Sequence, residues 1–280
     1  MSRAGRPAVR PARAGDLARL GPLYEAAGFG ARLAGVVGFA KARLDGEVVV
    51  AEAGGDLAGV AAAAVFAGTG WVGGVAVVPA HRRAGLGGAL TAAIVGFLED
   101  RGATTVLLHA TALGRPVYER LGFVAETDYL TLTGPSLARP GRPGRVRPGR
   151  AEDLEAVLAL DRAATGEDRR RLLAALWPAG GLVAGDGWGP PGGYHVASPW
   201  RSGGAVVAAD PEAGLALLDA VRAGHGDEVA ISLPAANTQA VRTLESAGLR
   251  QRDRTVRMHR GPRVPWRPDA VFAAHNLFWG

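Results

Sequence analysis

The segment most informative about the architecture of this chain is Trp71-Val-Gly-Gly-Val-Ala-Val-Val-Pro-Ala-His-Arg-Arg-Ala-Gly-Leu-Gly-Gly-Ala-Leu90. Its first part, Val72 to Val78, is an apolar and largely β-branched run before Pro79, which predicts a mostly buried strand. From Ala89 to Glu99 apolar residues recur at helical spacing, and a glycine-rich turn separates the two elements. Such a turn leaves the first N–H groups of the helix open to a ligand, and these donors with the helix dipole suit a phosphate or diphosphate.

Two arginines, Arg82 and Arg83, lie in this turn and add charge-assisted hydrogen bonds for the same anion. Two familiar phosphate motifs do not fit. A P-loop needs a lysine after its glycines, whereas Lys41 is the only lysine and no such loop precedes it. A dinucleotide fingerprint needs a third glycine where Leu90 stands. The turn therefore predicts a diphosphate ligand bound in another way.

Together with the segments before and after it, this stretch resembles the GNAT family of acyl-CoA-dependent N-acyltransferases, and the resemblance covers about residues 9–134. The family's central motif, Arg/Gln-x-x-Gly-x-Gly/Ala, is matched by Arg82-Arg83-Ala84-Gly85-Leu86-Gly87. The next motif, Tyr-x-x-x-Gly-Phe, is matched by Tyr118 and by Gly122-Phe123. The fold class implied is α/β (α+β), with a mixed, mostly antiparallel twisted sheet flanked by helices.

The resemblance also implies acetyl-CoA or another acyl-CoA as co-substrate, without a metal. The end of the strand would pair with the pantetheine arm and polarise the acyl carbonyl, and the turn would hold the pyrophosphate. The cofactor-binding residues implied are Val75, Ala76, Val77, Arg82, Arg83, Ala84, Gly85, Leu86, Gly87 and Gly88.

Transfer to an amine needs an acid for the leaving thiolate and a base for the amine. Tyr118 stands where the family has its usual general acid, although an aromatic residue there could also serve only to fill space between helix and sheet. The base is open, because no acidic residue lies on the strand Trp71–Val78. His109 is one candidate, or a structural histidine; Glu52, Glu126 and a water relaying to the backbone are others.

Composition narrows the classes of function. Hydrophobic residues at 48% with charged residues at 21% fit a soluble globular protein, and the lack of cysteine excludes a cysteine nucleophile and thiolate metal sites. The net charge of +6 suits an anionic ligand or nucleic acid, but no nucleic-acid-binding motif is present. The most apolar stretch, 57–67, is too short to span a bilayer. We expect a cytoplasmic monomer or homodimer with no nucleic-acid or membrane partner.

An internal repeat predicts two copies of the fold. Val9-Arg10-Pro11 with Asp16-Leu17 recurs as Val146-Arg147-Pro148 with Asp153-Leu154. The stretch between the copies is rich in Pro, Gly and Arg and lacks apolar periodicity, which favours a linker. The expected domains are a catalytic acyl-CoA-binding GNAT domain at 1–134, a linker at 135–149 and a degenerate GNAT-like domain at 150–280.

The second copy has lost the chemistry of the first. The corresponding turn reads Ala209-Asp210-Pro211-Glu212-Ala213-Gly214, so carboxylates stand where a diphosphate would bind. Leu244 stands in the position of the tyrosine. This pattern is similar to two-domain GNAT proteins that pair an active first domain with a divergent second one.

The favoured function is transfer of an acyl group from acyl-CoA, acetyl-CoA above all, to a small-molecule amine by direct transfer in a ternary complex. Two alternatives stay open at this stage. One is a CoA-binding sensor or scaffold without catalysis. The other is an enzyme of the same fold with different acyl-CoA chemistry, such as O-acylation or decarboxylation.

Overall fold

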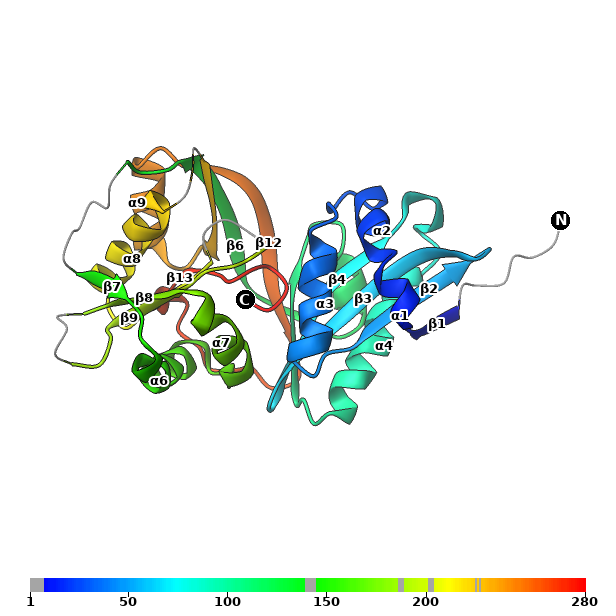
Figure 1. Cartoon of the computed structure of the whole chain (residues 1–280). Helices are drawn as coiled ribbons and strands as arrows, with labels where there is room; N and C mark the ends of the chain where they lie inside the picture. The colour runs from blue at the N-terminus through cyan, green and yellow to red at the C-terminus, as the bar shows by residue number, and fades with distance from the viewer. Residues whose placement is uncertain (1–7, 139–144, 186–188, 201–203, 225, 227) are drawn as a thin grey trace. The chain divides into compact units, whose positions relative to one another are not determined.

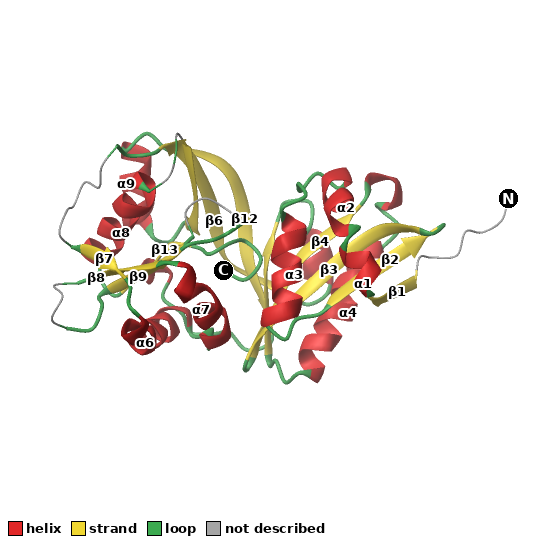
Figure 2. Cartoon of the chain, in the orientation of Figure 1, coloured by secondary structure: helices red, strands yellow, loops and turns green. Residues whose placement is uncertain are grey.

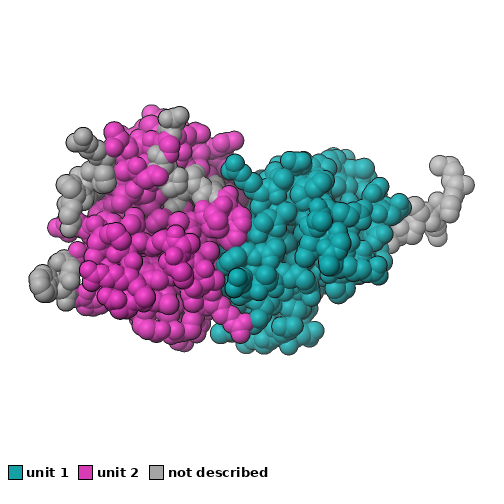
Figure 3. Space-filling model, in the orientation of Figure 1, with its two compact units in different colours: residues 1–124, 259–262, 279 teal, residues 125–258, 263–278, 280 magenta. Residues whose placement is uncertain are grey.

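The computed structural model describes residues 8–138, 145–185, 189–200, 204–224, 226 and 228–280. The chain forms two compact units (Figure 3). Unit 1 holds the residues up to Val124, the segment His259–Pro262 and Trp279. Unit 2 holds Ala125–Met258, Arg263–Phe278 and Gly280. Among the described residues no helix combines the length and the apolar character needed to cross a membrane.

Unit 1 is a mixed sheet with helices on both faces, as expected (Figures 1 and 2). Its strand order is β1-β2-β3-β4-β5, antiparallel except for the parallel pair β4–β5. Helices α2 and α3 lie on one face of the sheet and α4 on the other. The elements are β1 (Ala8–Pro11), α1 (Ala14–Leu17), α2 (Leu20–Ala26), α3 (Leu33–Arg43), β2 (Val48–Ala53), β3 (Asp56–Phe66), β4 (Thr69–Val77), α4 (Leu86–Asp100), β5 (Thr105–Ala110) and α5 (Arg115–Arg120).

Small residues on β3 and β4 let α4 approach the sheet closely. A Cβ added at Gly70 would lie 2.5 Å from Leu98 Cδ2, and one at Gly59 would lie 2.8 Å from Leu90 Cδ1. Both leucines are completely buried. Because carbon atoms do not approach that closely, glycine is required at these two strand positions for the helix to pack as it does.

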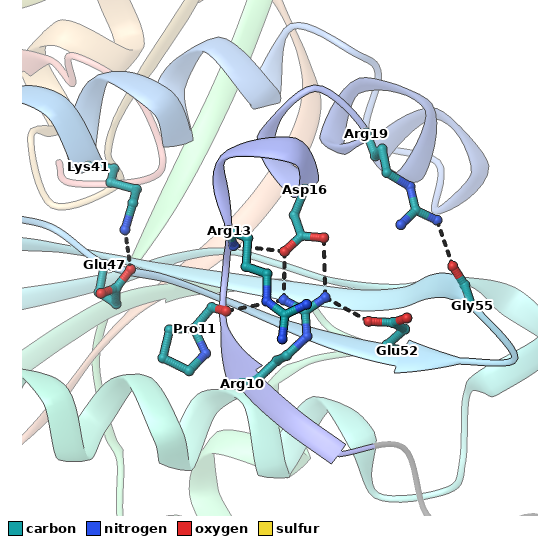
Figure 4. Close-up of polar contacts among 9 residues, drawn as sticks. All are labelled: Arg10, Pro11, Arg13, Asp16, Arg19, Lys41, Glu47, Glu52 and Gly55. Carbon is teal, nitrogen blue, oxygen red and sulfur yellow. Dashed lines mark hydrogen bonds and ion pairs between the residues drawn. The ribbon is translucent and has the colours of Figure 1, made fainter.

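The repeated Arg-Pro…Asp motif is a structural clip. Arg10 Nη1 and Nη2 donate to the Asp16 carboxylate at 2.6 and 3.2 Å, and the Arg13 N–H donates to it at 2.8 Å (Figure 4). These contacts tie β1 to the start of α1. The hydrogen bonds lower the pKa of Asp16 to about 2. In unit 2, Arg147 and Asp153 form the same bidentate pair, with both distances 2.7 Å.

Unit 2 contains a five-stranded sheet, β13-β10-β9-β8-β7, packed against α6 and α8. Its buried apolar core includes Leu217, Val221, Ile231 and Leu244. The elements are β6 (Val124–Pro135), β7 (Val146–Pro148), α6 (Leu154–Thr165), α7 (Arg170–Leu176), β8 (Gly181–Ala184), β9 (Gly193–Val196), β10 (Ala205–Ala208), α8 (Pro211–Ala223), β11 (Glu228–Pro234), α9 (Thr238–Ser246), β12 (Arg250–Arg260) and β13 (Val271–Ala273).

The final strand of each copy contributes to the other compact unit. Strand β6 follows the first copy but belongs, from Ala125, to unit 2, where it pairs with β11 antiparallel. The end of β12 belongs to unit 1, where the Thr105 hydroxyl donates to the Pro262 carbonyl at 2.6 Å. The compact units therefore divide at Val124, whereas the sequence-based limits 1–134, 135–149 and 150–280 stay a prediction about the two copies. Residues 139–144 of the predicted linker lie outside the described residues.

Candidate functional site

The two parallel strands of unit 1 separate at their carboxyl ends. β4 pairs with β5 from Thr69 opposite Thr105 to Trp71 opposite Leu107. Beyond this point both strands continue, β4 to Val77 and β5 to Ala110, without further pairing to each other. One edge of β4 is therefore not paired with β5 over its last residues.

The backbone groups on this edge belong to predicted site residues. The Val78 N–H donates to the Ala58 carbonyl at 3.0 Å, and Ala76 pairs with Val60, so alternate residues of this part of β4 face β3. Val75 and Val77 face the other edge, where β5 has diverged. Such an edge can hydrogen-bond an extended ligand that carries amide groups. Ala76 differs, because its backbone faces β3.

The turn after β4 has the features of an anion site. Gly85 caps α4 with a left-handed φ of 75°, a conformation that favours glycine. No side chain caps this helix end and no acidic residue lies in its first turn. The residues from Arg82 to Gly85 are exposed, whereas Leu86 is buried and anchors the helix. The positive end of the α4 dipole therefore faces solvent.

The two arginines of the turn differ in their contacts. Arg82 Nε donates to the Val77 carbonyl at 3.0 Å, and its Nη2 donates to the Ala27 carbonyl at 2.9 Å. Its guanidinium thus holds the turn to the end of β4 and to the end of α2. Arg83 is exposed, has a left-handed φ of 65°, and makes no side-chain hydrogen bond within the described part of the chain. Direct ligand contacts of both arginines stay predictions.

The glycines of the first helical turn bring α5 next to this region. A Cβ on Gly87 would lie 3.9 Å from Val77 Cγ2, and one on Gly88 would lie 3.7 Å from Val117 Cγ1. Val117 precedes Tyr118 on α5. The predicted acid is therefore carried by a helix that packs beside the predicted diphosphate turn.

The ring of Tyr118 is largely buried, with 9% of the residue exposed. It meets Phe123 edge to face at 6.1 Å, and a Cβ on Gly114 would lie only 2.9 Å from Tyr118 Cε2. Burial raises the pKa of Tyr118 to about 12, so its hydroxyl stays protonated at neutral pH. Its hydroxyl has no hydrogen-bond partner among the described residues. The geometry is compatible with both the acid role and a packing role.

The candidate bases His109, Glu52 and Glu126 each contact another side chain. The His109 ring stacks on Trp71 at 5.2 Å and 12°, and Trp71 is only 1% exposed, which makes Trp71 a core residue. Glu52 accepts a hydrogen bond from Arg10 at 2.6 Å. Glu126 is a buried carboxylate in unit 2 and lies 2.9 Å from Arg257 Nη1. A catalytic role for His109 stays a prediction.

Two further residues at this site, Tyr24 and Gly74, are not among the residues that the sequence predicts for it. The Tyr24 hydroxyl donates to the Gly74 carbonyl at 2.8 Å, and Gly74 lies in a bulge of β4. A signal for the bulge was present, because glycine inside a strand pattern often marks one. No local signal pointed to Tyr24, which lies on α2, fifty positions before Gly74 in the sequence.

The corresponding turn of unit 2 is closed to an anion. Asp210 caps α8, its carboxylate accepting from the Ala213 N–H at 2.9 Å. Glu212 lies in the first turn and pairs with Arg145 at 2.5 Å. A Cβ on Gly214 would lie 2.4 Å from the ring of Phe272, so this glycine serves packing. This helix end is capped by the Asp210 carboxylate, and Glu212 adds a second negative charge in its first turn.

Comparison with known families agrees with this architecture. Two family models, each described as "Acetyltransferase (GNAT) domain", match residues 44–125 and 157–273. The first match contains the β4–α4 turn and Tyr118, and the second contains most of the second copy. The chain belongs to the GNAT superfamily and is a tandem two-domain member of it, with an acetyltransferase domain in each half.

Solved structures share the fold over nearly the whole chain. A putative acetyltransferase from Pyrococcus horikoshii is 19% identical with a TM-score of 0.84, covering 99% of this chain and 96% of that one. A GCN5-related N-acetyltransferase from Sphaerobacter thermophilus is 23% identical (TM-score 0.62, coverage 94% and 97%). A tandem GNAT protein from the clavulanic acid biosynthesis pathway is 17% identical (TM-score 0.62, coverage 91% and 99%). A search of curated proteins finds no match.

Proposed function

We propose that this protein is an acyl-CoA-dependent N-acyltransferase that uses acetyl-CoA and acylates a small-molecule amine directly, in a ternary complex. The observation that carries the proposal is the open edge of β4, which is followed, after the 3-10 turn Pro79–His81 and the residues up to Gly85, by the uncapped start of α4. An extended amide-containing arm ending in a diphosphate matches both features. The two GNAT domains support the same activity class.

In this proposal the first domain holds the donor. The Val75 carbonyl and the Val77 N–H pair with the pantetheine arm, and the N–H groups from Gly85 to Gly88 bind the pyrophosphate. Arg83 adds a positive charge from the exposed side of the turn. Arg82 contributes through its two bonds to backbone carbonyls, which keep the turn next to the strand end.

Transfer forms a bond between the amine nitrogen and the acyl carbon and breaks the bond from that carbon to sulfur. A β4 N–H donates to the acyl oxygen as negative charge develops there. Tyr118 donates its proton, or a hydrogen bond, to the departing sulfur. The proton lost by the amine passes to His109 or to water.

The test combines binding with turnover. Calorimetry with acetyl-CoA should show binding to the wild-type chain and none to Gly85→Glu, which places a side chain and a negative charge where the pyrophosphate approaches the backbone. Thiol release measured over a panel of amines, with the product mass determined, should show an N-acylated amine. Near-wild-type affinity in Gly85→Glu would contradict the site.

The other outcomes identify the alternatives. Tight binding of acetyl-CoA with no thiol release over a wide amine panel would favour a sensor or scaffold. A product acylated on oxygen, or a decarboxylated acyl-CoA, would replace N-acylation with other chemistry on the same site.

A further inference from the structure

Strand β4 contains a bulge that is held by a residue outside the proposed acetyl-CoA site. On β3 a single residue, Ala61, lies between the paired positions Val60 and Ala62, whereas β4 has Gly74 and Val75 between Gly73 and Ala76. Gly74 has a left-handed φ of 60°. Two residues opposite one make a bulge, and a bulge re-aims the backbone groups of its strand.

The bulge is held from another element. Tyr24, on α2, is completely buried and its hydroxyl donates to the Gly74 carbonyl at 2.8 Å. Burial raises the pKa of Tyr24 well above its usual range, so the phenol stays a donor at every working pH. The Gly74 carbonyl thus has a fixed partner outside the β-ladder.

This bond fixes the direction of one amide. The Gly74 carbonyl and the Val75 N–H belong to a single planar trans peptide, so they point in opposite directions. Ala61 is paired with Val49 of β2. Every second residue of β3 directs its backbone groups to the same side, and the N–H groups of Ala63 and Val65 donate to the Glu47 and Leu44 carbonyls on the β2 side. The backbone groups of Ala61 therefore also face β2. The Val75 N–H therefore lies outside the β3 ladder and points away from Tyr24.

We propose that Tyr24 is a positioning residue for acyl transfer: it locks the Gly74–Val75 peptide so that the Val75 N–H is pre-oriented toward the acyl oxygen of the donor. This inference rests on the proposed function. Its reason is energetic, because a donor fixed before the reaction needs no reorientation as charge develops. Without the bond, a peptide flanked by glycine rotates readily.

The test measures the acetyl carbonyl of bound acetyl-CoA and does not require a known acceptor amine. Acetyl-CoA labelled with carbon-13 at the acetyl carbonyl is bound to wild type and to Tyr24→Phe, and its carbonyl stretch is recorded by infrared difference spectroscopy. In wild type the stretch should lie below its solution frequency, and Tyr24→Phe should lose most of that displacement. The affinity for acetyl-CoA should change less than about threefold, because the diphosphate turn is intact. Once an acceptor is known, kcat should fall roughly tenfold with KM for acetyl-CoA nearly unchanged.

Tyr129→Phe is the matched control, since it also removes the hydroxyl of a buried tyrosine, but on β6 of unit 2. It should keep the full displacement. Gly74→Ala is the second variant and covers the case in which Tyr24→Phe does not fold; it strains the left-handed bulge and should also reduce the displacement.

The outcomes separate the two proposals. A wild-type chain that does not bind acetyl-CoA overturns the proposed function and this inference with it. Binding with an unshifted carbonyl, or a displacement retained in both Tyr24→Phe and Gly74→Ala, overturns the inference alone. Loss of the displacement in Tyr129→Phe as well would show a general effect of tyrosine removal and would also overturn it.

Discussion

Arg83 combines an unfavourable backbone conformation with an exposed charge. A left-handed φ costs a residue with a side chain about 1–2 kcal/mol, and no hydrogen bond of its side chain within the described residues offsets that cost. Strain retained beside an open helix N-terminus is typical of a functional position. We interpret Arg83 as the cation that the turn presents to the diphosphate.

Replacing Arg83 by glycine separates ligand binding from stability. Glycine adopts this φ without strain, so Arg83→Gly should leave the melting temperature unchanged or slightly raised. The affinity for acetyl-CoA in calorimetry should fall about tenfold, since one charge-assisted contact is lost. Arg101→Ala removes the same charge at the opposite end of α4, where Arg101 stacks on Phe97, and should leave affinity unchanged. Equal losses in both variants would assign the effect to net charge.

For Tyr118, the raised pKa makes a prediction about pH. The phenol is protonated below about pH 12, so it keeps its proton throughout the range from pH 7 to 10. Tyr118→Phe should lower kcat by about 10²–10⁴-fold by a constant factor over that range, with little change in acetyl-CoA affinity. The measurement is a pH–rate profile of both proteins. If the two profiles converge near pH 10, the pKa of Tyr118 is not raised by burial. An unchanged kcat would make Tyr118 a packing residue.

At the scale of elements, the Arg-Pro…Asp clip explains why the repeat is visible in the sequence. Arg10 and Asp16 join the first strand to the first helix of unit 1, and Arg147 and Asp153 do the same in unit 2. The carboxylate accepts three hydrogen bonds in unit 1 and is almost completely removed from water. An aspartate in that position cannot be replaced by a residue of another shape without leaving donors unpaired.

The clip predicts an acid-sensitive contribution to stability. Folding lowers the pKa of Asp16 to about 2, so its contribution is present above the unfolded pKa near 4 and is lost as pH falls toward 2. The shift corresponds to about 2 kcal/mol at neutral pH. Asp16→Asn should lose this amount at pH 7 and show a flatter dependence between pH 4 and 2 in denaturant unfolding. Asp56→Asn, which removes the exposed partner of Arg19, should change little; a comparable loss there would refute the assignment.

In the molecule as a whole, the corresponding helix N-termini of the two domains differ in charge. The α4 end is uncapped and flanked by arginine, whereas the α8 end is capped by Asp210 and carries Glu212. A carboxylate at a helix N-terminus already uses a favourable interaction of about 0.3–1 kcal/mol and repels a second anion. Two copies of the fold therefore do not imply two cofactors.

We expect one CoA per chain, bound by the first domain. Calorimetric titration of the full chain should give a stoichiometry of one, and Gly85→Glu should bring it to zero. The matched change in unit 2, Asp210→Asn with Glu212→Gln, removes both charges and should leave the stoichiometry at one, because the glycine turn is also missing there. Two equivalent sites in the wild-type chain would contradict the assignment of the second domain.

Local sequence determined the elements and the order in which they occur. The apolar run of 72–78, the helical spacing of 89–99 and the glycines of the turn specify backbone conformation over short distances, and these elements appear in the structure close to where the patterns place them. The same holds for the open turn of the first domain and the carboxylate-capped turn of the second. Capping and helix-end charge depend on a few adjacent residues, so they can be predicted from sequence.

Pairing between distant segments cannot be predicted from the local sequence and follows from the assembled fold. Nothing in the local sequence specifies that β6 pairs with β11 or that the end of β12 belongs to unit 1. The bond from Tyr24 to Gly74 and the two carbonyls held by Arg82 are of the same kind. Each joins groups that lie far apart in the chain or whose directions follow from a bulge or a turn. Because hydrogen bonds and strand register depend on the relative position of whole elements, these contacts exist only once the fold has formed.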